Sequence, residues 1–322
     1  QSAQPVLETA FAVARDLSAH VEVLHVRADS RNAVPLLGEG MSGAMIEEMI
    51  DLAESEAATR AEKARAVFDD VCKRFEFPVV DGPPGPDGPS AAWIDRTGRE
   101  DEVTAQRGRL SDLIVVGRPT EDTDVSSRMT LSAAIRETGR PVLVVPPGAP
   151  QTLGKKVAIA WNGSAEAARA VRLSVAFVEA ADEVIILTAE GGHTRAVEAS
   201  ELADYLAWHG VSATARAFEI ADGAGGEQLL RECAEIGADV LLLGAYTQSR
   251  VRQLIMGGIT RHVLAEATLP VVMAPLRCRL SRATSPRVSR SMTRAISGGN
   301  WRLPVGSRLY SRSPTRRVGR VL

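Results

Sequence analysis

Glycines at one strand-to-helix junction give this chain its best candidate for a binding site. The apolar run over residues 239–243 ends at Gly244, and after a polar loop the pair Gly257-Gly258 precedes a helical pattern over residues 259–267. At such a junction in an open α/β sheet, backbone N–H groups at the helix N-terminus bind phosphate oxygens, and glycine lets the ligand approach the backbone. The spacing therefore predicts an anion site beyond the carboxyl end of this strand.

Side chains in the intervening loop have opposite expected effects on anion binding at this site. Arg250 and Arg252 carry guanidinium groups that can clamp a phosphate through two hydrogen bonds. Thr247 has a Cβ that disfavours positive φ and crowds a ligand. A structural interpretation stays open beside the functional one: Gly257-Gly258 would simply let the chain turn into a helix that Thr260 caps.

Residues able to catalyse a reaction or to bind a metal do not occur in a recognisable pattern. The five histidines and three cysteines are scattered, and none has the spacing of a metal site, a catalytic triad or a disulfide framework. His25 falls within a strand pattern, and Ser164 lacks the Gly-x-Ser-x-Gly elbow, so a structural histidine and a helix cap are the better interpretations. We expect no catalytic residue and no tightly bound metal, and the isolated thiols favour a cytoplasmic protein.

A repeat organises the chain into two similar halves. The strand pattern over residues 112–117 recurs at 239–244, and the pattern over 140–146 recurs at 269–275, with a helical stretch between the strands each time. One domain therefore occurs twice. We place the first copy at residues 1–148 and the second at residues 153–276.

The second copy alternates apolar strands with amphipathic helices. Continuous apolar strands between helices are typical of a parallel sheet covered on both faces, and right-handed crossovers make the sheet doubly wound. The fold class is therefore α/β, with two tandem Rossmann-like domains. The expected strands are 155–161, 183–188, 212–220, 239–244 and 270–275, and the expected helices are 165–180, 194–209, 226–237 and 259–267.

The first copy begins differently from the second. Its first pattern, residues 4–15, is a helix rather than a strand, and a strand over 21–26 and a long helix over 42–75 follow. We therefore expect this domain to lack its first strand. Two neighbouring strands would then have backbone groups without partners, so the domain would be unstable in isolation.

Charge separates the body of the chain from its end. All 40 acidic residues precede residue 277, whereas twelve arginines lie within residues 277–322. This tail, residues 277–322, is rich in Ser, Gly and Pro and has no apolar periodicity, so we predict a basic disordered tail. A non-functional appendage is favoured over an arm that binds nucleic acid. No apolar run approaches the roughly 20 residues that a membrane-spanning helix needs, so we expect no membrane partner.

The tandem arrangement resembles the universal stress protein family in its two-domain form. The resemblance rests on residues 161–164 after a strand, on the Gly244 and Gly257-Gly258 segments, and on the closing strand at 270–275. It covers roughly residues 4–276. It implies a five-stranded parallel sheet in the order 3-2-1-4-5 and a dimer-like contact through the last strand. Many members of the family bind ATP through Gly-x2-Gly-x9-Gly-[Ser/Thr].

The motif is only partly present. Gly244 and Gly257 match its first and third glycines, but Thr247 replaces the second, and Gly258 stands where Ser or Thr is expected. Asn162 replaces the acidic residue that usually meets the nucleoside. The resemblance thus implies a nucleotide site, and the residues that it assigns to this site are Asn162, Gly244, Tyr246, Thr247, Arg250, Gly257, Gly258, Ile259 and Thr260.

These features predict a cytoplasmic stress-response protein that binds ATP, alone or with Mg²⁺, in its carboxy-terminal domain and acts by regulation rather than catalysis. In the first copy, acidic Glu121, Asp122 and Asp124 follow Gly117, and Arg128-Met129 replaces the glycine pair, so no phosphate site is expected there. The alternative is an interaction module without a nucleotide, in which the repeat forms an intramolecular pseudo-dimer or the chain a homodimer. Slow ATP hydrolysis is a third reading, for which the sequence offers no evident base.

Overall fold

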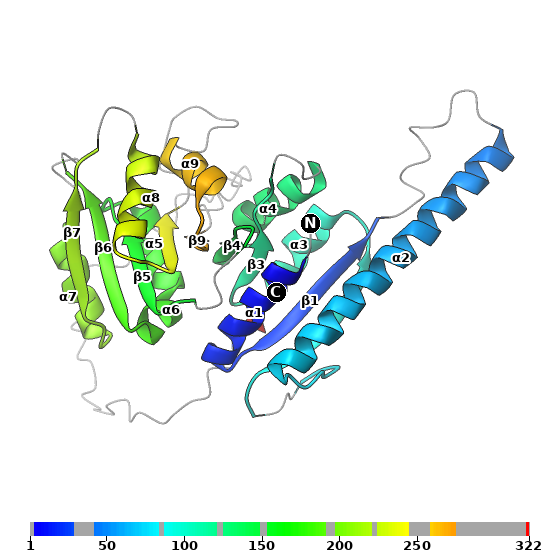
Figure 1. The fold of residues 1–322 in the computed structure, drawn as a ribbon, viewed down its shortest axis with the longest axis horizontal. Helices are drawn as coiled ribbons and strands as arrows, with labels where there is room; N and C mark the ends of the chain where they lie inside the picture. Colours follow the sequence, from blue (N-terminus) through cyan, green and yellow to red (C-terminus); the bar gives the residue numbers. More distant parts are fainter. Residues whose placement is uncertain are drawn as a thin grey trace, which may run out of the picture.

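The structure is a computed structural model in which two α/β domains share one large sheet (Figure 1). A second, smaller sheet belongs to the amino-terminal domain. No helix in the described part of the chain has both the length and the apolar character that crossing a bilayer requires. The residues that the structure describes are 3–28, 42–83, 87–120, 125–148, 153–190, 197–220, 224–244, 258–274 and 320–321.

Five parallel strands of the carboxy-terminal domain form most of the large sheet. Their order is β7-β6-β5-β8-β9, which is 3-2-1-4-5 within the domain, so the predicted fold class is confirmed. β5, β6, β8 and β9 are short apolar runs buried on both faces at their centres, as a parallel sheet requires, whereas the edge strand β7 is mostly exposed. The bounds are Lys156–Ala160 for β5, Glu183–Ala189 for β6, Ala213–Phe218 for β7, Val240–Gly244 for β8 and Val271–Ala274 for β9.

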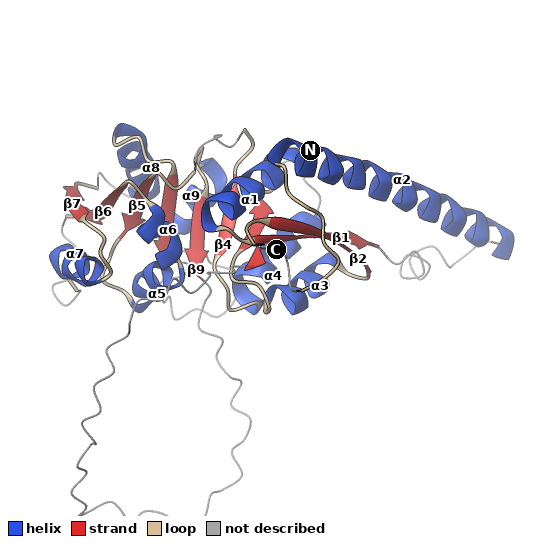
Figure 2. Cartoon of the chain, turned by 90° about the horizontal axis from the view of Figure 1, so that it is seen from below, coloured by secondary structure: helices blue, strands red, loops and turns tan. Residues whose placement is uncertain are grey.

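Helices cover both faces of these strands. Side chains of α5, α6 and α7 join one apolar cluster, and side chains of α8 and α9 join another on the opposite face. Figure 2 shows α5 and α7 on one side of the sheet and α8 on the other. The bounds are Ala165–Leu173 for α5, Val175–Ala180 for α6, Ala199–Trp208 for α7, Gly225–Glu235 for α8 and Gly258–Glu266 for α9.

The single helix predicted over residues 165–180 is wrong, because the chain forms two helices there. Ser174 ends α5 and precedes α6, with φ −106° and ψ 16°. Its backbone N–H donates to the carbonyl oxygens of both Ala170 and Val171. Serine is a weak helix former in a helix interior, so its position between the two segments fits its propensity.

The amino-terminal domain divides its strands between the two sheets. β3 (Ile114–Gly117) and β4 (Val142–Val145) extend the large sheet, and β4 pairs with β9 in antiparallel register. β1 (His20–Arg27) and β2 (Ser90–Thr97) pair with each other in parallel. The helices of this domain are α1 (Gln4–Leu17), α2 (Gly43–Phe75), α3 (Glu100–Gly108) and α4 (Val125–Glu137).

The first element described in this domain is α1, as the sequence predicts. The strand β10, Arg320–Val321, pairs in parallel with the start of β1. It occupies the side of β1 that the order 3-2-1-4-5 assigns to a first strand. At these two residues the structure differs from the predicted disordered tail, because the backbone groups of β1 offer hydrogen-bond partners to an extended segment. The rest of the tail lies outside the described residues.

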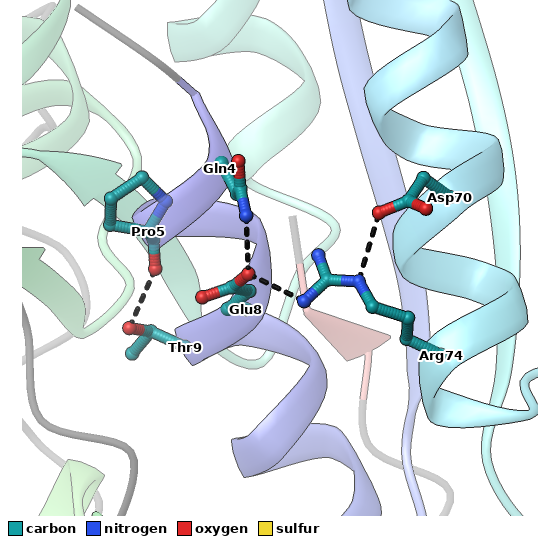
Figure 3. Close-up of polar contacts among 6 residues, drawn as sticks. All are labelled: Gln4, Pro5, Glu8, Thr9, Asp70 and Arg74. Carbon is teal, nitrogen blue, oxygen red and sulfur yellow. Dashed lines mark hydrogen bonds and ion pairs between the residues drawn. The ribbon is translucent and has the colours of Figure 1, made fainter.

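A polar contact joins α1 to the carboxy end of α2 (Figure 3). Oε1 of Glu8 accepts hydrogen bonds from Nε2 of Gln4 and from a guanidinium N–H of Arg74, both at 2.8 Å. Nε of Arg74 donates to Asp70 at 2.8 Å. The bond from Gln4, followed by the bond from Arg74, lowers the pKa of the Glu8 carboxyl. The ionised carboxylate therefore stabilises the packing of α1 against α2.

We expect Glu8→Gln to remove a pH-dependent part of the stability of this domain. A lowered pKa in the folded state means that the contribution is complete above the ordinary glutamate value of about 4.3 and is lost as pH falls through the folded-state value. Urea unfolding at a series of pH values should show a wild-type advantage at pH 7 that vanishes at the acidic end. Because the pair is partly exposed, the advantage is small. An advantage independent of pH would contradict the assignment.

Candidate functional site

The carboxyl ends of β5 and β8 meet at one edge of the large sheet. The two strands are parallel neighbours, with Ala160 opposite Leu243. The chain leaves β5 toward β6 on one side and reaches β8 on the other, so the strand order reverses between them. In open α/β sheets, ligands bind in the crevice at such a reversal. Asn162 and Gly244 follow or end these strands and therefore lie at the same edge.

The turn after β5 is fixed by local hydrogen bonds. Oδ1 of Asn162 accepts the backbone N–H of Ser164 at 3.1 Å, and Oγ of Ser164 accepts the backbone N–H of Ala167 at 3.2 Å. The predicted cap at Ser164 is therefore confirmed. Trp161 is buried before this turn, and its indole N–H donates to the carbonyl of Val197 at 2.8 Å. Asn162 itself is exposed, and its side chain shapes the turn.

Gly244 permits a close approach between two backbones. A Cβ at this position would lie 2.7 Å from the amide nitrogen of Ala167 and 2.8 Å from the carbonyl carbon of Glu166. Both atoms belong to the backbone of the first turn of α5, so they cannot move away through a change of side-chain rotamer. The absence of a side chain at Gly244 thus lets the start of α5 pack directly on the end of β8. Sequence reasoning assigns this glycine to ligand approach, whereas its observed contact is with the protein's own helix.

Four of the residues that the sequence assigns to the site fall between β8 and α9. Tyr246, Thr247, Arg250 and Gly257 were assigned to the nucleotide by resemblance and lie outside the described residues. The description resumes at Gly258, the first residue of α9. A Cβ added at Gly258 would meet no described atom within 4 Å, so no described residue packs against this position.

Thr260 does not cap α9, in contrast to the structural interpretation of the sequence. It is the third residue of the helix and lies on its buried face with Val263 and Leu264. Only 6% of Thr260 is exposed, whereas its neighbour Ile259 is 41% exposed. The reason is helical periodicity, which places positions 260, 263 and 264 toward the sheet.

Two charged residues that sequence reasoning missed connect distant segments. Asp239, just before β8, accepts backbone N–H bonds from Gly154, Lys155 and Lys156 at 2.9–3.1 Å. Arg118, just after β3, donates to the carbonyl of Ala267 at 2.6 Å, beyond the carboxyl end of α9. Burial lowers the pKa of Arg118, and the negative charge of Glu266 opposes this effect. A guanidinium at a helix C-terminus also interacts favourably with the helix dipole. These contacts span long sequence separations, so no local pattern reveals them.

The described histidines and cysteines form no reactive cluster. Nδ1 of His25 lies 3.2 Å from Oδ1 of Asp95, and the imidazole ring of His25 stacks on Trp93. Burial raises the pKa of Cys72 to about 11 and that of Cys233 to about 12, so both thiols are protonated at neutral pH. Among the described residues, no group of three or more His, Cys, Asp or Glu side chains is arranged to hold a metal ion.

The counterpart of the site in the first copy differs at the end of its strand and at the positions that match the glycine pair. Gly117 ends β3 as Gly244 ends β8, but a Cβ there would meet only a methyl group of Val6, at 3.1 Å. Arg128 and Met129 lie within α4, and a guanidinium N–H of Arg128 donates to the carbonyl of Thr120. The acidic positions 121–124 lie outside the described residues.

Comparisons with known proteins agree on one family. Residues 154–275 match the family model described as the universal stress protein family. The universal stress protein Slr1230 of Synechocystis sp. is 23% identical over 273 residues, which cover 81% of this chain and 91% of that protein. The crystal structure of a universal stress protein from Archaeoglobus fulgidus is 14% identical and covers 84% of this chain and 93% of that chain, with a TM-score of 0.60. At this identity the structural likeness supports the fold alone.

Proposed function

Since this chain belongs to the universal stress protein family, we propose that its carboxy-terminal domain binds ATP and that binding serves regulation rather than catalysis. The observation that carries the proposal is that no described atom lies within 4 Å of a Cβ added at Gly258, the first residue of α9, the helix that follows β8 at the reversal of strand order. The first backbone N–H groups of a helix have no partner within the helix, so the start of α9 can offer them to phosphate oxygens. We further propose that the protein acts in the cytoplasm.

Each proposed site residue has a physical role. Gly257 and Gly258 present the backbone to the phosphates, and Thr260, whose side chain is buried toward the sheet, contributes the backbone N–H of the first turn of α9. Arg250 supplies positive charge, and Mg²⁺ accompanies the phosphates where charge neutralisation requires it. Asn162 borders the nucleoside from the turn after β5. Gly244 keeps the start of α5 close to β8, and Tyr246, Thr247 and Ile259 line the loop and the exposed side of the helix.

Gly258→Ser is the sharpest test of this site. Serine restores the hydroxyl that the family motif carries at this position, and its Cβ meets no described atom. One added hydrogen bond to a phosphate is worth about 1 kcal/mol, which corresponds to roughly fivefold tighter ATP binding. Isothermal titration calorimetry of the full chain with Mg-ATP measures this change.

The loss-of-function arm is the double substitution Gly257→Val and Gly258→Val, which should weaken ATP binding at least about tenfold by filling the phosphate cradle. Arg128→Val with Met129→Val, at the matching position of the first copy, is the control and should leave affinity unchanged. Circular dichroism establishes that each variant is folded. Absence of saturable binding in the wild type, or equal affinity in both double variants, would rule out the site.

A second candidate function is an interaction module that binds no nucleotide. The pairing of β4 with β9 and the bond from Arg118 to Ala267 favour it, because both contacts connect the two domains, as an intramolecular pseudo-dimer requires. A thermal-shift comparison of nucleotides with organic acids separates the two functions. In this alternative, no nucleotide shifts the unfolding temperature.

A further inference from the structure

In the described part of the chain, β1 and β3 each have one side with few strand partners or none. β3 is the end strand of the large sheet and pairs only with β4. β1 pairs along its whole length with β2. On its other side, only its first two residues pair with a described strand, and that strand is β10. Both strands therefore present backbone N–H and C=O groups that a further strand can bind.

The hydrogen bonds on the paired sides identify which residues point their backbone groups the other way. In a parallel ladder, both backbone groups of a residue point to the same side, and successive residues alternate. The carbonyls of Ala19 and Arg27 accept N–H bonds from either end of β2, so the even-numbered residues of β1 point away from β2. The N–H groups of Ile114 and Arg118 donate to either end of β4, so the odd-numbered residues of β3 point away from β4.

These two sides face each other, because one helix contacts both strands on each face. On the first face, α1 packs against β1 and β3, and its side chains share one apolar cluster with residues of both strands (Figure 1). On the second face, a guanidinium nitrogen of Arg107 in α3 lies 3.3 Å from the carboxylate of Glu22 in β1. The next residue, Gly108, lies against β3, since a Cβ there would be 2.7 Å from Cδ1 of Ile114. Consecutive residues of α3 thus hold the two strands close together.

We call the space between these two sides the β1–β3 slot. β1 and β3 border it, and α1 and α3 cover its two faces. Backbone groups covered in this way need partners, because an unpaired N–H or C=O away from water costs free energy. An extended segment between two parallel strands supplies partners to both rows at once. The slot is therefore suited to one strand of peptide.

Among the described residues, the strand that enters this slot is β10. Arg320 and Val321 are in parallel register with His20 and Val21. The residue in register with Val21 lies between the slot-facing backbone groups of His20 and Glu22, as the parallel pattern requires. Val21 is 1% exposed, so the register brings an apolar residue type to a buried position of the ladder. Residues 275–319, which connect β9 to β10, span roughly 150 Å when extended, so the tail can reach the slot.

We propose that the β1–β3 slot is a strand-binding site and that its occupant is β10 of the same chain, inserted between β1 and β3. The inserted strand joins the small sheet to the large one and completes the amino-terminal domain. The arginine-rich tail is then a structural part of this domain rather than the appendage that its composition predicts. A free peptide with the sequence of β10 binds the slot when β10 itself is prevented from entering. The proposal does not depend on nucleotide binding, because the slot belongs to the other domain.

Hydrogen exchange in the full chain tests the insertion. Val321→Pro removes an N–H that a strand between two partners needs, and Val288→Pro, in the tail outside β10, is the matched control. The slot-facing amides of His20 and Glu22 should exchange at least tenfold faster in Val321→Pro than in the control, and so should the odd-numbered amides of β3. The amides of β6, in the other domain, are the internal reference and should be unchanged.

The same experiment can overturn the proposal in three ways. Equal exchange in the two variants would show that β10 does not protect the slot. Faster exchange in β1 alone would show that β10 does not lie between β1 and β3. Protection of β1 that falls when the wild type is diluted would assign the inserted strand to a second copy of the chain.

A fluorescent peptide with the sequence of residues 313–322 tests the exchange of strands. Fluorescence anisotropy should show saturable binding to the Val321→Pro chain, and at least tenfold weaker binding to the wild type and to Val288→Pro, in which β10 occupies the slot. A peptide carrying Val321→Glu should bind at least tenfold more weakly, because it brings a charge to the buried position beside Val21. Equal binding of the peptide to all three chains would assign it to the acidic surface of the body and would overturn the proposal.

Discussion

Gly244→Ala should lower the free energy of unfolding by about 2–3 kcal/mol, the upper range for forcing extra volume into a packed site. The new Cβ would lie within 2.8 Å of two backbone atoms of α5, so the helix start has to move away from β8. Urea unfolding followed by circular dichroism measures the loss.

Gly117→Ala is a closely matched control for this substitution, because Gly117 ends the corresponding strand of the first copy. Its Cβ would meet only a rotatable valine side chain, so we expect a change below about 1 kcal/mol. Both substitutions reduce the freedom of the unfolded chain equally, and this effect cancels in the comparison. Equal losses for the two variants would show that the contact with α5 does not set the cost at Gly244. We further expect Gly244→Ala to weaken ATP binding, since the displaced α5 carries the turn with Asn162.

Asp239→Ala should destabilise the carboxy-terminal domain by about 2–3 kcal/mol, because three backbone N–H groups lose a charged acceptor. These bonds hold residues 154–156 at the start of β5. Gly154 adopts a positive φ of 77° there, so this start also depends on glycine. Hydrogen exchange at residues 154–156 should accelerate in the variant.

Asp239→Asn should cost about half as much as Asp239→Ala, because the amide keeps one acceptor oxygen and turns a donor toward the remaining N–H. The matched control is Asp112→Ala at the corresponding position of the first copy. Asp112 is largely exposed and lies 3.9 Å from Arg140, so its replacement should change stability by less than about 1 kcal/mol. A loss at Asp112 as large as that at Asp239 would contradict the role given to the three backbone bonds.

Buried strands and glycines were the features that the sequence could predict. Continuous apolar runs such as Val240–Leu243 predict strands of a covered parallel sheet, and all five expected strands of the second copy lie within two residues of the observed bounds at both ends. The order of these strands followed from the resemblance. The cap at Ser164 was predictable because capping is local. The strand β2, Ser90–Thr97, was not predictable. It lies at a sheet edge, and its polar residues include both buried and exposed ones.

Contacts between the copies were beyond sequence reasoning for a physical reason. The bond from Arg118 to Ala267 and the pairing of β10 with β1 join segments whose proximity depends on the complete fold. The role of Gly244 was predicted only in part, since a glycine after a strand indicates close approach but not what approaches. Within the proposed nucleotide site, the positions between β8 and α9 remain predictions.

The antiparallel pairing of β4 with β9 also has a kinetic consequence. Two separate copies of such a domain would meet only as often as their concentration allows, whereas here a covalent linker holds the strands at a high effective concentration. Dilution cannot separate the pair, and cutting the linker between residues 148 and 153 would convert a unimolecular encounter into a bimolecular one. The tandem chain thus keeps its shared sheet at the low copy numbers at which a dimer of single domains would dissociate.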